Sequence, residues 1–173
     1  MNADVGQEID GLKGLTNASA KELLDSFVQR AVNMTESDMG YFAVLNDKGD
    51  LLTMLAWSVT AMDTCAMIDQ PLLYPVKQTG LWGDAVRERC PVITNDYESS
   101  RRVTKKGYPK GHVDVLRHAN LPVWEGDRIV GVVGVGNKNS DYTQGDMEVL
   151  TAYVREGWGI IKSAALDLTS QPS

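Results

Sequence analysis

The residues best suited to chemistry gather in one segment, 101–118, which carries six basic side chains and one acid, Asp114. Both histidines of the chain, His112 and His118, belong to this segment. An arginine binds a carboxylate or a phosphate through two parallel hydrogen bonds, and an imidazole adds a further donor. We therefore predict that His112, Arg117 and His118 present donors to an anionic or carbonyl-bearing ligand. Four further basic residues are predicted to be solvated charges on a long loop, and these are Arg101, Arg102, Lys105 and Lys106.

Polar and aromatic side chains follow the apolar stretch 91–94, where the chain leaves a predicted strand. Tyr97 could stack on a flat ligand, and Asp96 could orient one of the basic side chains of the loop. Asn95 or Asp96 could equally form an Asx turn by hydrogen bonding to its own backbone. The two interpretations are compatible, and Asn95, Asp96 and Tyr97 stay candidates for ligand binding.

Three aromatic residues, Trp57, Tyr74 and Trp82, are candidates for an apolar pocket wall, because ligand pockets are mostly apolar with few polar groups. Aromatic residues on strands belong more often to the core, and we assign Trp57 to the core. For Trp82 both interpretations stay open, since Gly80 and Gly83 beside it favour a close approach of the backbone.

The sequence offers no set of residues that would assemble a catalytic centre. Cys65 and Cys90 stand 25 residues apart with no companion at a metal-binding spacing, which argues against a zinc site. No glycine-rich phosphate loop precedes a predicted helix. We predict a protein that is not an enzyme, holds no metal and requires no cofactor. Haem stays open, because haem iron needs only one protein histidine.

Composition describes an ordinary globular chain of 173 residues, with 43% hydrophobic and 23% charged residues. Its net charge of −6 argues against nucleic-acid binding, which needs a cationic surface. Its apolar runs are shorter than the roughly 20 residues of a membrane helix, and its start lacks the features of a secretion signal. We expect a cytoplasmic protein with no nucleic-acid or membrane partner.

The candidate residues need a sheet to position them, and the stretch 129–136 predicts its central strand. Successive side chains of a strand point to opposite faces, and here both faces are apolar. Such a strand is covered on both sides and lies inside a sheet. Gly134 and Gly136 share one face, so we predict a shallow trough there in which a bound molecule or another segment approaches the backbone.

The remaining periodicities predict an α+β domain. They indicate, in chain order, a helix over 17–34, a hairpin of 39–45 and 51–58, a short helix over 80–89, a strand over 91–94, a long loop over 95–120, a hairpin within 121–137 and a final helix from 143. We predict a flexible leader over 1–15, one domain over 16–168 and a flexible tail over 169–173. Asn137, Lys138 and Asp146 are assigned to the fold, with Lys138 and Asp146 joining the central strand to the last helix.

The order of elements and several short motifs resemble the GAF domain, a sensor module of signalling proteins, and most closely its bacterial sensory subgroup. The motifs are Gly80-Leu-Trp-Gly, Pro91-Val-Ile-Thr-Asn-Asp-Tyr97, Lys106-Gly-Tyr-Pro-Lys-Gly-His112, Arg117-His118 and Val133-Gly-Val-Gly-Asn-Lys138. Asn137, Lys138, Tyr142 and Asp146 also resemble a signature of cyclic-nucleotide-binding GAF domains, with Tyr142 in place of Phe and Met147 in place of its Glu.

The resemblance implies a GAF- or PAS-like antiparallel sheet of about six strands. It places the N- and C-terminal helices on one face, and a short helix and ligand-pocket loops on the other. It adds Tyr108 to the candidate ligand residues, which are Trp82, Asn95, Asp96, Tyr97, His112, Arg117, His118 and Gly134.

The implied function is a non-catalytic sensor of a small anionic or polar planar ligand. We expect it to form a homodimer through its terminal helices and to act on an output domain such as a kinase or a cyclase, as in a two-component system. Two alternatives stay open. One is a free-methionine-sulfoxide reductase, whose cysteine pattern Cys65 and Cys90 do not match, and the other is a haem-based redox or gas sensor.

Overall fold

The computed structural model describes residues 4–64, 73–107 and 113–170, and the fold is built on one six-stranded sheet. All neighbouring strands are antiparallel, in the order β3-β2-β1-β6-β5-β4. The strands are β1 Met39–Leu45, β2 Leu51–Trp57, β3 Leu73–Pro75, β4 Val92–Thr94, β5 His118–Glu125 and β6 Arg128–Gly136. The helices are α1 Val5–Lys13, α2 Ala20–Met34, α3 Val59–Thr64, α4 Asp84–Glu88 and α5 Gln144–Ser170, with 3-10 turns η1 Val76–Gln78 and η2 Leu81–Gly83.

The central strand is β6, as its two apolar faces predict. It pairs with β1 on one side and β5 on the other, and every residue from Ile129 to Gly136 is buried. The number of strands and the mixed α+β class also agree with the prediction. Because β6 lies inside the sheet, its glycines set how closely the neighbouring side chains can pack over it.

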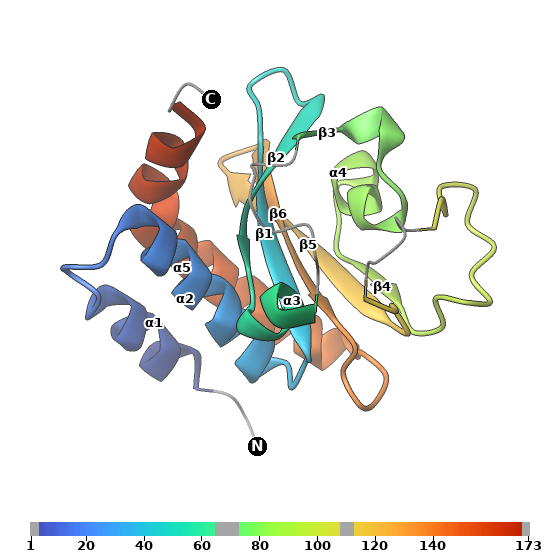
Figure 1. Cartoon of the computed structure of the whole chain (residues 1–173), viewed down its shortest axis with the longest axis horizontal. Helices are drawn as coiled ribbons and strands as arrows, with labels where there is room; N and C mark the ends of the chain where they lie inside the picture. Colours follow the sequence, from blue (N-terminus) through green and yellow to red (C-terminus); the bar gives the residue numbers. More distant parts are fainter. Residues whose placement is uncertain (1–3, 65–72, 108–112, 171–173) are drawn as a thin grey trace.

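Three helices, α1, α2 and α5, cover one face of the sheet (Figure 1). Their apolar stripes pack on the sheet around Phe27, whose ring stacks on Tyr153 at 5.2 Å and meets Phe42 edge-on at 5.7 Å. α2 begins at a capping box, in which Ser19 and Glu22 satisfy each other's backbone N–H groups. In this layer, α5 packs against one face of the sheet, and the same strands form the other face described below.

The prediction of a flexible leader over residues 1–15 is wrong for the described part of that range. Residues 5–13 form α1, which buries Ile9 and Leu12, and Glu8 pairs with Arg30 of α2 at 2.6 Å. Glycines lower helix propensity and hide this helix in the sequence. A Cβ atom at Gly11 would lie 2.5 Å from an Arg30 guanidinium nitrogen, so a larger residue there would require this flexible side chain to move. At the other end, α5 continues through Ser170, so the described part of the predicted tail is helical.

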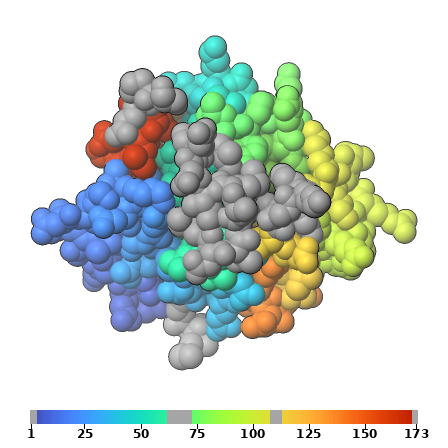
Figure 2. Space-filling view, in the orientation of Figure 1, coloured from blue at the N-terminus to red at the C-terminus, as the bar shows by residue number. Residues whose placement is uncertain are grey.

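The other face of the sheet carries η1, η2, α4 and the described residues 95–107 and 113–117, which we together call the lid loop. Figure 1 shows these parts on the side opposite α1, α2 and α5, and in Figure 2 the yellow-green part of the lid loop forms the right-hand edge of the molecule. β5 begins at His118 instead of Leu121, because residues 118–120 pair with β4. The sheet thus presents His118 and Asn120 to this face.

Among the described helices, none combines the length and the apolar character needed to cross a bilayer.

Candidate functional site

A cavity of about 180 Å³ lies between the sheet and the segments that cover this second face. Its walls are largely aromatic, and the ring-bearing residues among the described lining are Tyr41, Trp57, Tyr74, Trp82, Tyr97 and His118. An engineered protein cavity of about 150 Å³ is known to hold benzene, so this volume suits a compound of one ring. It is smaller than the roughly 300–1,000 Å³ of pockets for drug-sized ligands.

Trp82 is the wall residue that connects the covering segment to the strands. Its ring meets Tyr41 edge-on at 5.7 Å and Tyr74 edge-on at 5.2 Å. The turn that carries it requires Gly83, because a Cβ atom there would lie 1.7 Å from Thr79 Oγ1. Of the two interpretations left open for Trp82, the structure supports the pocket wall. Trp57, assigned to the core from its sequence, also lines the cavity, beside Tyr41.

The glycine trough predicted on β6 is present, but the protein's own side chains occupy it at Gly134. A Cβ atom at this position would lie 2.1 Å from Tyr41 Cε1 and 2.6 Å from Asn120 Oδ1. Both side chains come from strands that flank β6, since Tyr41 and Asn120 are the register partners of Gly134. Gly134 therefore admits the groups that form the cavity floor, and a ligand would meet those groups.

The floor of the cavity carries a chain of three polar side chains. Tyr41 donates its hydroxyl hydrogen to Asn120 Oδ1 at 2.6 Å, and Asn120 Nδ2 lies 2.6 Å from His118 Nδ1. The other ring nitrogen, His118 Nε2, is buried and has no hydrogen-bond partner among the described residues. An unpartnered buried polar atom is rare and costly, so this nitrogen is a candidate for contact with another group.

Burial keeps the His118 imidazole neutral. Desolvation lowers the pKa of His118 to about 4, with Arg102 acting in the same direction and Asp84 opposing it. Burial also raises the pKa of the Tyr41 hydroxyl far above its usual range. The cavity floor therefore carries no charge at neutral pH.

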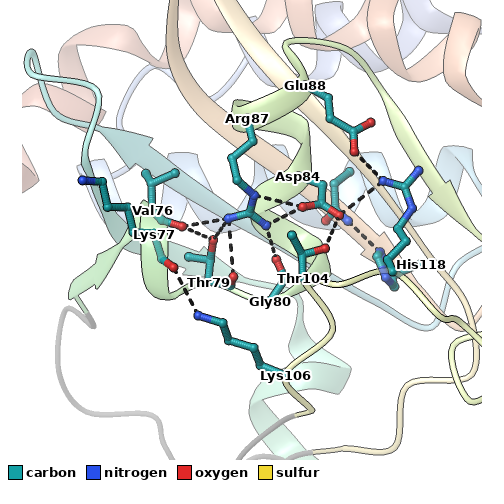
Figure 3. Close-up of polar contacts among 12 residues, drawn as sticks. Val76, Lys77, Thr79, Gly80, Asp84, Arg87, Glu88, Thr104, Lys106 and His118 are labelled. Carbon is teal, nitrogen blue, oxygen red and sulfur yellow. Dashed lines mark hydrogen bonds and ion pairs between the residues drawn. The ribbon is translucent and has the colours of Figure 1, made fainter.

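Asp84 is a buried carboxylate that fastens the lid loop beside this floor, as Figure 3 shows. Its side chain is 2% exposed and pairs with Arg87 at 2.5 Å and with Arg102 at 3.3 Å. Thr104 donates its hydroxyl hydrogen to the same carboxylate at 2.8 Å. Two residues of the lid loop, Arg102 and Thr104, thus bind one acid at the start of α4. Arg102 also pairs with Glu88 at the end of that helix, at 2.5 Å.

The predicted role of Arg117 in ligand binding is not supported by its position. Its guanidinium group donates to Lys138 O at 2.7 Å and lies 3.6 Å from Asp141, and Arg117 is not part of the cavity lining. The side chain projects from the end of the lid loop toward the segment before α5 because residue 118, not 117, shares the cavity face of β5. The basic residue nearest the predicted strand therefore serves the fold.

Two lysines of the lid loop also bind protein groups. Lys105 donates to Glu98 O at 2.6 Å and lies 5.0 Å from the centre of the Tyr97 ring. Lys106 donates to Lys77 O at 3.1 Å. Within the described residues, no lysine or arginine lines the cavity. The positive charges that led us to expect an anionic ligand therefore lie outside the cavity lining in the described part of the chain.

The candidate ligand residues that follow β4 fall into two groups: one lines the cavity, and the others form hydrogen bonds within the protein. Tyr97 lines the cavity, and its ring meets that of His118 at 5.9 Å. Asn95 instead binds the backbone of Tyr142 twice, accepting from its N–H at 2.7 Å and donating to its carbonyl at 3.0 Å. Asp96 accepts from Ser99 N at 3.0 Å, which is the Asx turn considered as the alternative.

The structure thus brings together four of the predicted ligand residues, Trp82, Tyr97, His118 and Gly134, in the cavity lining. Asn95, Asp96 and Arg117 lie outside the lining. Tyr108 and His112 lie outside the described residues, and so does Cys65.

The residues assigned to the fold make the expected contacts. Lys138 Nζ lies 2.6 Å from Asp146 Oδ1, and Asp146 also accepts from Thr143 N at the start of α5. Asn137 accepts from Leu116 N at 2.8 Å. This segment therefore ties the end of the lid loop to the last helix.

Two residues of the site, Tyr41 and Asn120, are missing from the sequence-based candidates. Each of the two residues has a feature that could have indicated its role. Asn120 interrupts the apolar run around Ala119 and Leu121, and a buried amide in a strand needs partners. Tyr41 lies opposite Gly134 in the register of β1 and β6, so a large ring faces a position without a side chain.

The cysteine of the described residues, Cys90, is exposed and does not line the cavity. Within those residues, no three of the histidine, cysteine and acidic side chains group closely enough to hold a metal ion.

Comparison with known proteins identifies the family. The family model of the GAF domain matches residues 17–162. A relative in Methanosarcina acetivorans, the methyl sulfide methyltransferase-associated sensor, is 42% identical over 173 residues, which cover 95% of this chain and 17% of that protein. The chain therefore corresponds to a small part of a much longer relative.

Solved structures show the same fold at low identity. The GAF domain of a Coxiella burnetii phosphoenolpyruvate-protein phosphotransferase has a TM-score of 0.73 at 14% identity, covering 95% of this chain and 96% of that chain. The corresponding Acinetobacter domain has a TM-score of 0.71 at 16% identity, with coverages of 94% and 92%. A free methionine-R-sulfoxide reductase from Neisseria meningitidis has a TM-score of 0.67 at 12% identity, with coverages of 95% and 89%. With its six-stranded sheet and a match over most of its length, the chain belongs to the GAF domain family.

Proposed function

We propose that this chain is a non-catalytic sensory GAF domain that binds a small planar ligand in the cavity over β1, β6 and β5. One observation carries the proposal: a cavity of ring size with aromatic residues in its walls is lined by His118, whose buried Nε2 atom has no partner among the described residues. The 42% identity to a protein named as a sensor supports the sensory role. The neutral floor favours an uncharged polar ligand over the anionic one that the sequence suggested.

Matched variants on α3 test the cavity directly. Ala61 is buried in the lining, whereas Val59, on the same helix, is 62% exposed. A library of single-ring carbonyl and heteroaromatic compounds is screened by thermal shift. Compounds that raise the Tm of the wild type should raise that of Val59→Phe equally and leave that of Ala61→Phe unchanged. Equal shifts in all three proteins would place binding elsewhere and refute the proposal.

The signal would leave the site through the segment 137–142, which holds both ends of the lid loop. Asn95 binds Tyr142 at the start of the lid loop, and Arg117 binds Lys138 at its end. The Tyr142 hydroxyl also lies 2.7 Å from Ser37 Oγ, just after α2. The segment runs directly into α5, so a ligand that favours one lid position biases the packing of α2 and α5.

This route is tested by comparing two neighbouring variants. Asn95→Ala removes both bonds to Tyr142, whereas Asp96→Ala removes only the local turn to Ser99. With a compound from the screen, hydrogen exchange should show ligand protection of the lid loop in both proteins. Protection of residues 144–150 should persist in Asp96→Ala and be lost in Asn95→Ala. Its persistence in Asn95→Ala would exclude this route.

We also propose that the domain acts on an output domain. The relative is several times longer than this chain, which supports action on an output domain such as a kinase or a cyclase, in the same chain or in a partner. A cytoplasmic homodimer that works within a two-component system is the corresponding arrangement.

A haem-based redox or gas sensor is the second candidate, because a cavity-lining histidine whose Nε2 atom has no partner in the described part of the chain suits an axial ligand of haem iron. The 180 Å³ cavity is smaller than the macrocycle, so haem would require the walls to move apart. A visible absorption spectrum of the purified protein, with and without added haem, distinguishes the two candidates. A Soret band that shifts in His118→Ala would favour haem.

A reductase of the free-methionine-sulfoxide type receives no support from Cys90, which is exposed and outside the lining. Loss of thioredoxin-dependent reduction of methionine sulfoxide in Cys65→Ser or Cys90→Ser would be needed to establish it.

A further inference from the structure

We propose that Tyr41, Asn120 and His118 form a directional hydrogen-bond chain, which presents the Nε2–H group of His118 to the cavity and selects ligands that carry a neutral hydrogen-bond acceptor. The acceptor would be a carbonyl oxygen or an unprotonated ring nitrogen. This inference rests on the proposed function, since it names the class of ligand for the same cavity.

The direction of the chain follows from the groups at each link. Tyr41 donates to Asn120 Oδ1, so the amide NH2 group is the end that faces His118. An NH2 group can only donate, and His118 Nδ1 must therefore accept. In a neutral imidazole only one ring nitrogen carries hydrogen, so the hydrogen of His118 is on Nε2.

The surrounding residues hold this hydrogen-bond chain in place. Asn120 is 1% exposed and His118 is 8% exposed, so water has little access to either side chain. Gly134 leaves the space in which the Tyr41 ring and the Asn120 amide meet. Asp84 and Arg102 are the charged groups that act on His118, and they have opposite effects. The imidazole therefore stays neutral, and the tautomer is set by Asn120.

A second buried polar atom without a partner among the described residues belongs to Thr94, on the neighbouring strand. This atom is Thr94 Oγ1, and Thr94 is the register partner of His118 across β4 and β5. Directly opposed side chains in an antiparallel pair are neighbours on one face of the sheet. Thr94 is not part of the described cavity lining, so the ligand contact is assigned to His118 alone.

The rest of the cavity defines the remainder of the ligand. Aromatic faces and edges, including those of Trp57 and Trp82, surround the floor, and the volume fits one ring. A donor in an otherwise apolar pocket discriminates strongly, because a ligand without an acceptor leaves the donor unpaired. The predicted ligand is a single ring that bears one carbonyl or ring-nitrogen acceptor.

Isosteric probes test the selectivity. Pyridine and benzene have the same shape, and only pyridine carries an acceptor, which is unprotonated at pH 7.5. Binding measured by NMR titration should be at least about 10-fold tighter for pyridine with the wild type, and the ratio should fall toward one in His118→Leu. Equal binding of the two compounds to the wild type would overturn the selectivity but leave a ligand cavity. Absence of binding by both would overturn the ligand class as well.

The tautomer is tested without any ligand. Nitrogen-15 NMR of the histidine ring distinguishes the protonated nitrogen from the unprotonated one. We expect hydrogen on His118 Nε2 in the wild type, and a mixed population in Tyr41→Phe, where the Asn120 amide loses the donor that orients it. Hydrogen on Nδ1 in the wild type would overturn the proposal, whatever the cavity binds. Wild-type tautomer populations in Tyr41→Phe would remove Tyr41 from the chain.

Discussion

At the scale of single residues, the cavity side of the sheet holds two buried titratable groups in contrasting surroundings. Asp84 is surrounded by Arg87, Arg102 and the Thr104 hydroxyl. Among the described residues, His118 has one neutral partner, Asn120, and an unpaired Nε2 atom. The acid therefore fastens covering segments to the sheet face, while the histidine is left available to a ligand.

His118 should make the stability of the protein depend on pH. Its pKa is about 4 when folded and about 6.5 when unfolded, so between these values the unfolded state binds more protons. The free energy of unfolding therefore falls as pH decreases from about 6.5 to about 4, and this contribution changes no further below that. Urea denaturation at pH 7.5 and 4.5 should show about 2 kcal/mol more loss in the wild type than in His118→Gln. Equal losses would show that His118 is not desolvated.

The Asp84 pairs should matter more than the outer pair to Glu88. Asp84→Asn removes the charge that two guanidinium groups share, with an expected loss of about 2–3 kcal/mol, because the acid is buried. Glu88, whose side chain is 44% exposed, is the matched control, and Glu88→Gln should cost about 0.5 kcal/mol or less. Urea denaturation measures both. Limited proteolysis should cut within residues 98–107 faster in Asp84→Asn only, and unchanged cleavage would separate Asp84 from the lid loop.

Sequence reasoning located some of the site residues, and the reason for each failure is physical. His118, Tyr97 and Trp82, which line the cavity, could be singled out because their chemistry is unusual for their positions. Arg117 was expected beside the ligand but lies outside the lining, because side chains alternate between the faces of a strand and His118 takes the cavity face at the start of β5. Asn120 was overlooked because its role depends on a partner 79 positions away, Tyr41.

At the scale of elements, the sheet and the two long helices could be predicted because their apolar periods are regular. The hairpins, β6 at the centre and the start of α2 agree with those periods. α1 could not be predicted in this way. Its glycines weaken the local signal, and its stability comes from Ile9 and Leu12 packing in the core shared with α5.

Two glycines of α5 provide a matched test of how tightly this helix packs. A Cβ atom at Gly157 would lie 2.6 Å from Phe27 Cε2, whereas one at Gly159 would meet nothing within 4 Å. Gly157→Ala should lower the free energy of unfolding by about 1–3 kcal/mol through overpacking. Gly159→Ala should raise it by about 0.5–1 kcal/mol, because alanine favours the helix. Denaturant titration measures both, and a stabilised Gly157→Ala would mean that α5 sits farther from α2.

At the scale of the whole molecule, the homodimer proposed through the terminal helices would use the outer surface of α5. The apolar stripes of α2 and α5 are packed inside the protomer. On the described parts of α1, α2 and α5, the large hydrophobic side chain that remains exposed is Leu166, at 47%. It lies near the C-terminal end of a 27-residue helix, whereas α2 has 15 residues, so α5 offers a longer surface for pairing.

We therefore expect Leu166→Glu to weaken dimerisation. Light scattering after size-exclusion chromatography should give twice the 19.0 kDa chain mass for the wild type and a lower apparent mass for Leu166→Glu. Val103, which is fully exposed on the lid loop, supplies the control, and Val103→Glu should stay dimeric. A wild type that is monomeric at all concentrations would exclude pairing of these domains on their own.

The distribution of the four tryptophans gives the domain a built-in optical reporter. Trp57 and Trp82 line the cavity, whereas Trp158 is in the helical core and Trp124 is in the β5–β6 hairpin beneath the Arg89 guanidinium group. Occupancy of the cavity should change the emission of the first two and leave the others as a constant background. Intrinsic fluorescence can therefore follow binding and release in real time without a dye, and bound haem would quench that emission.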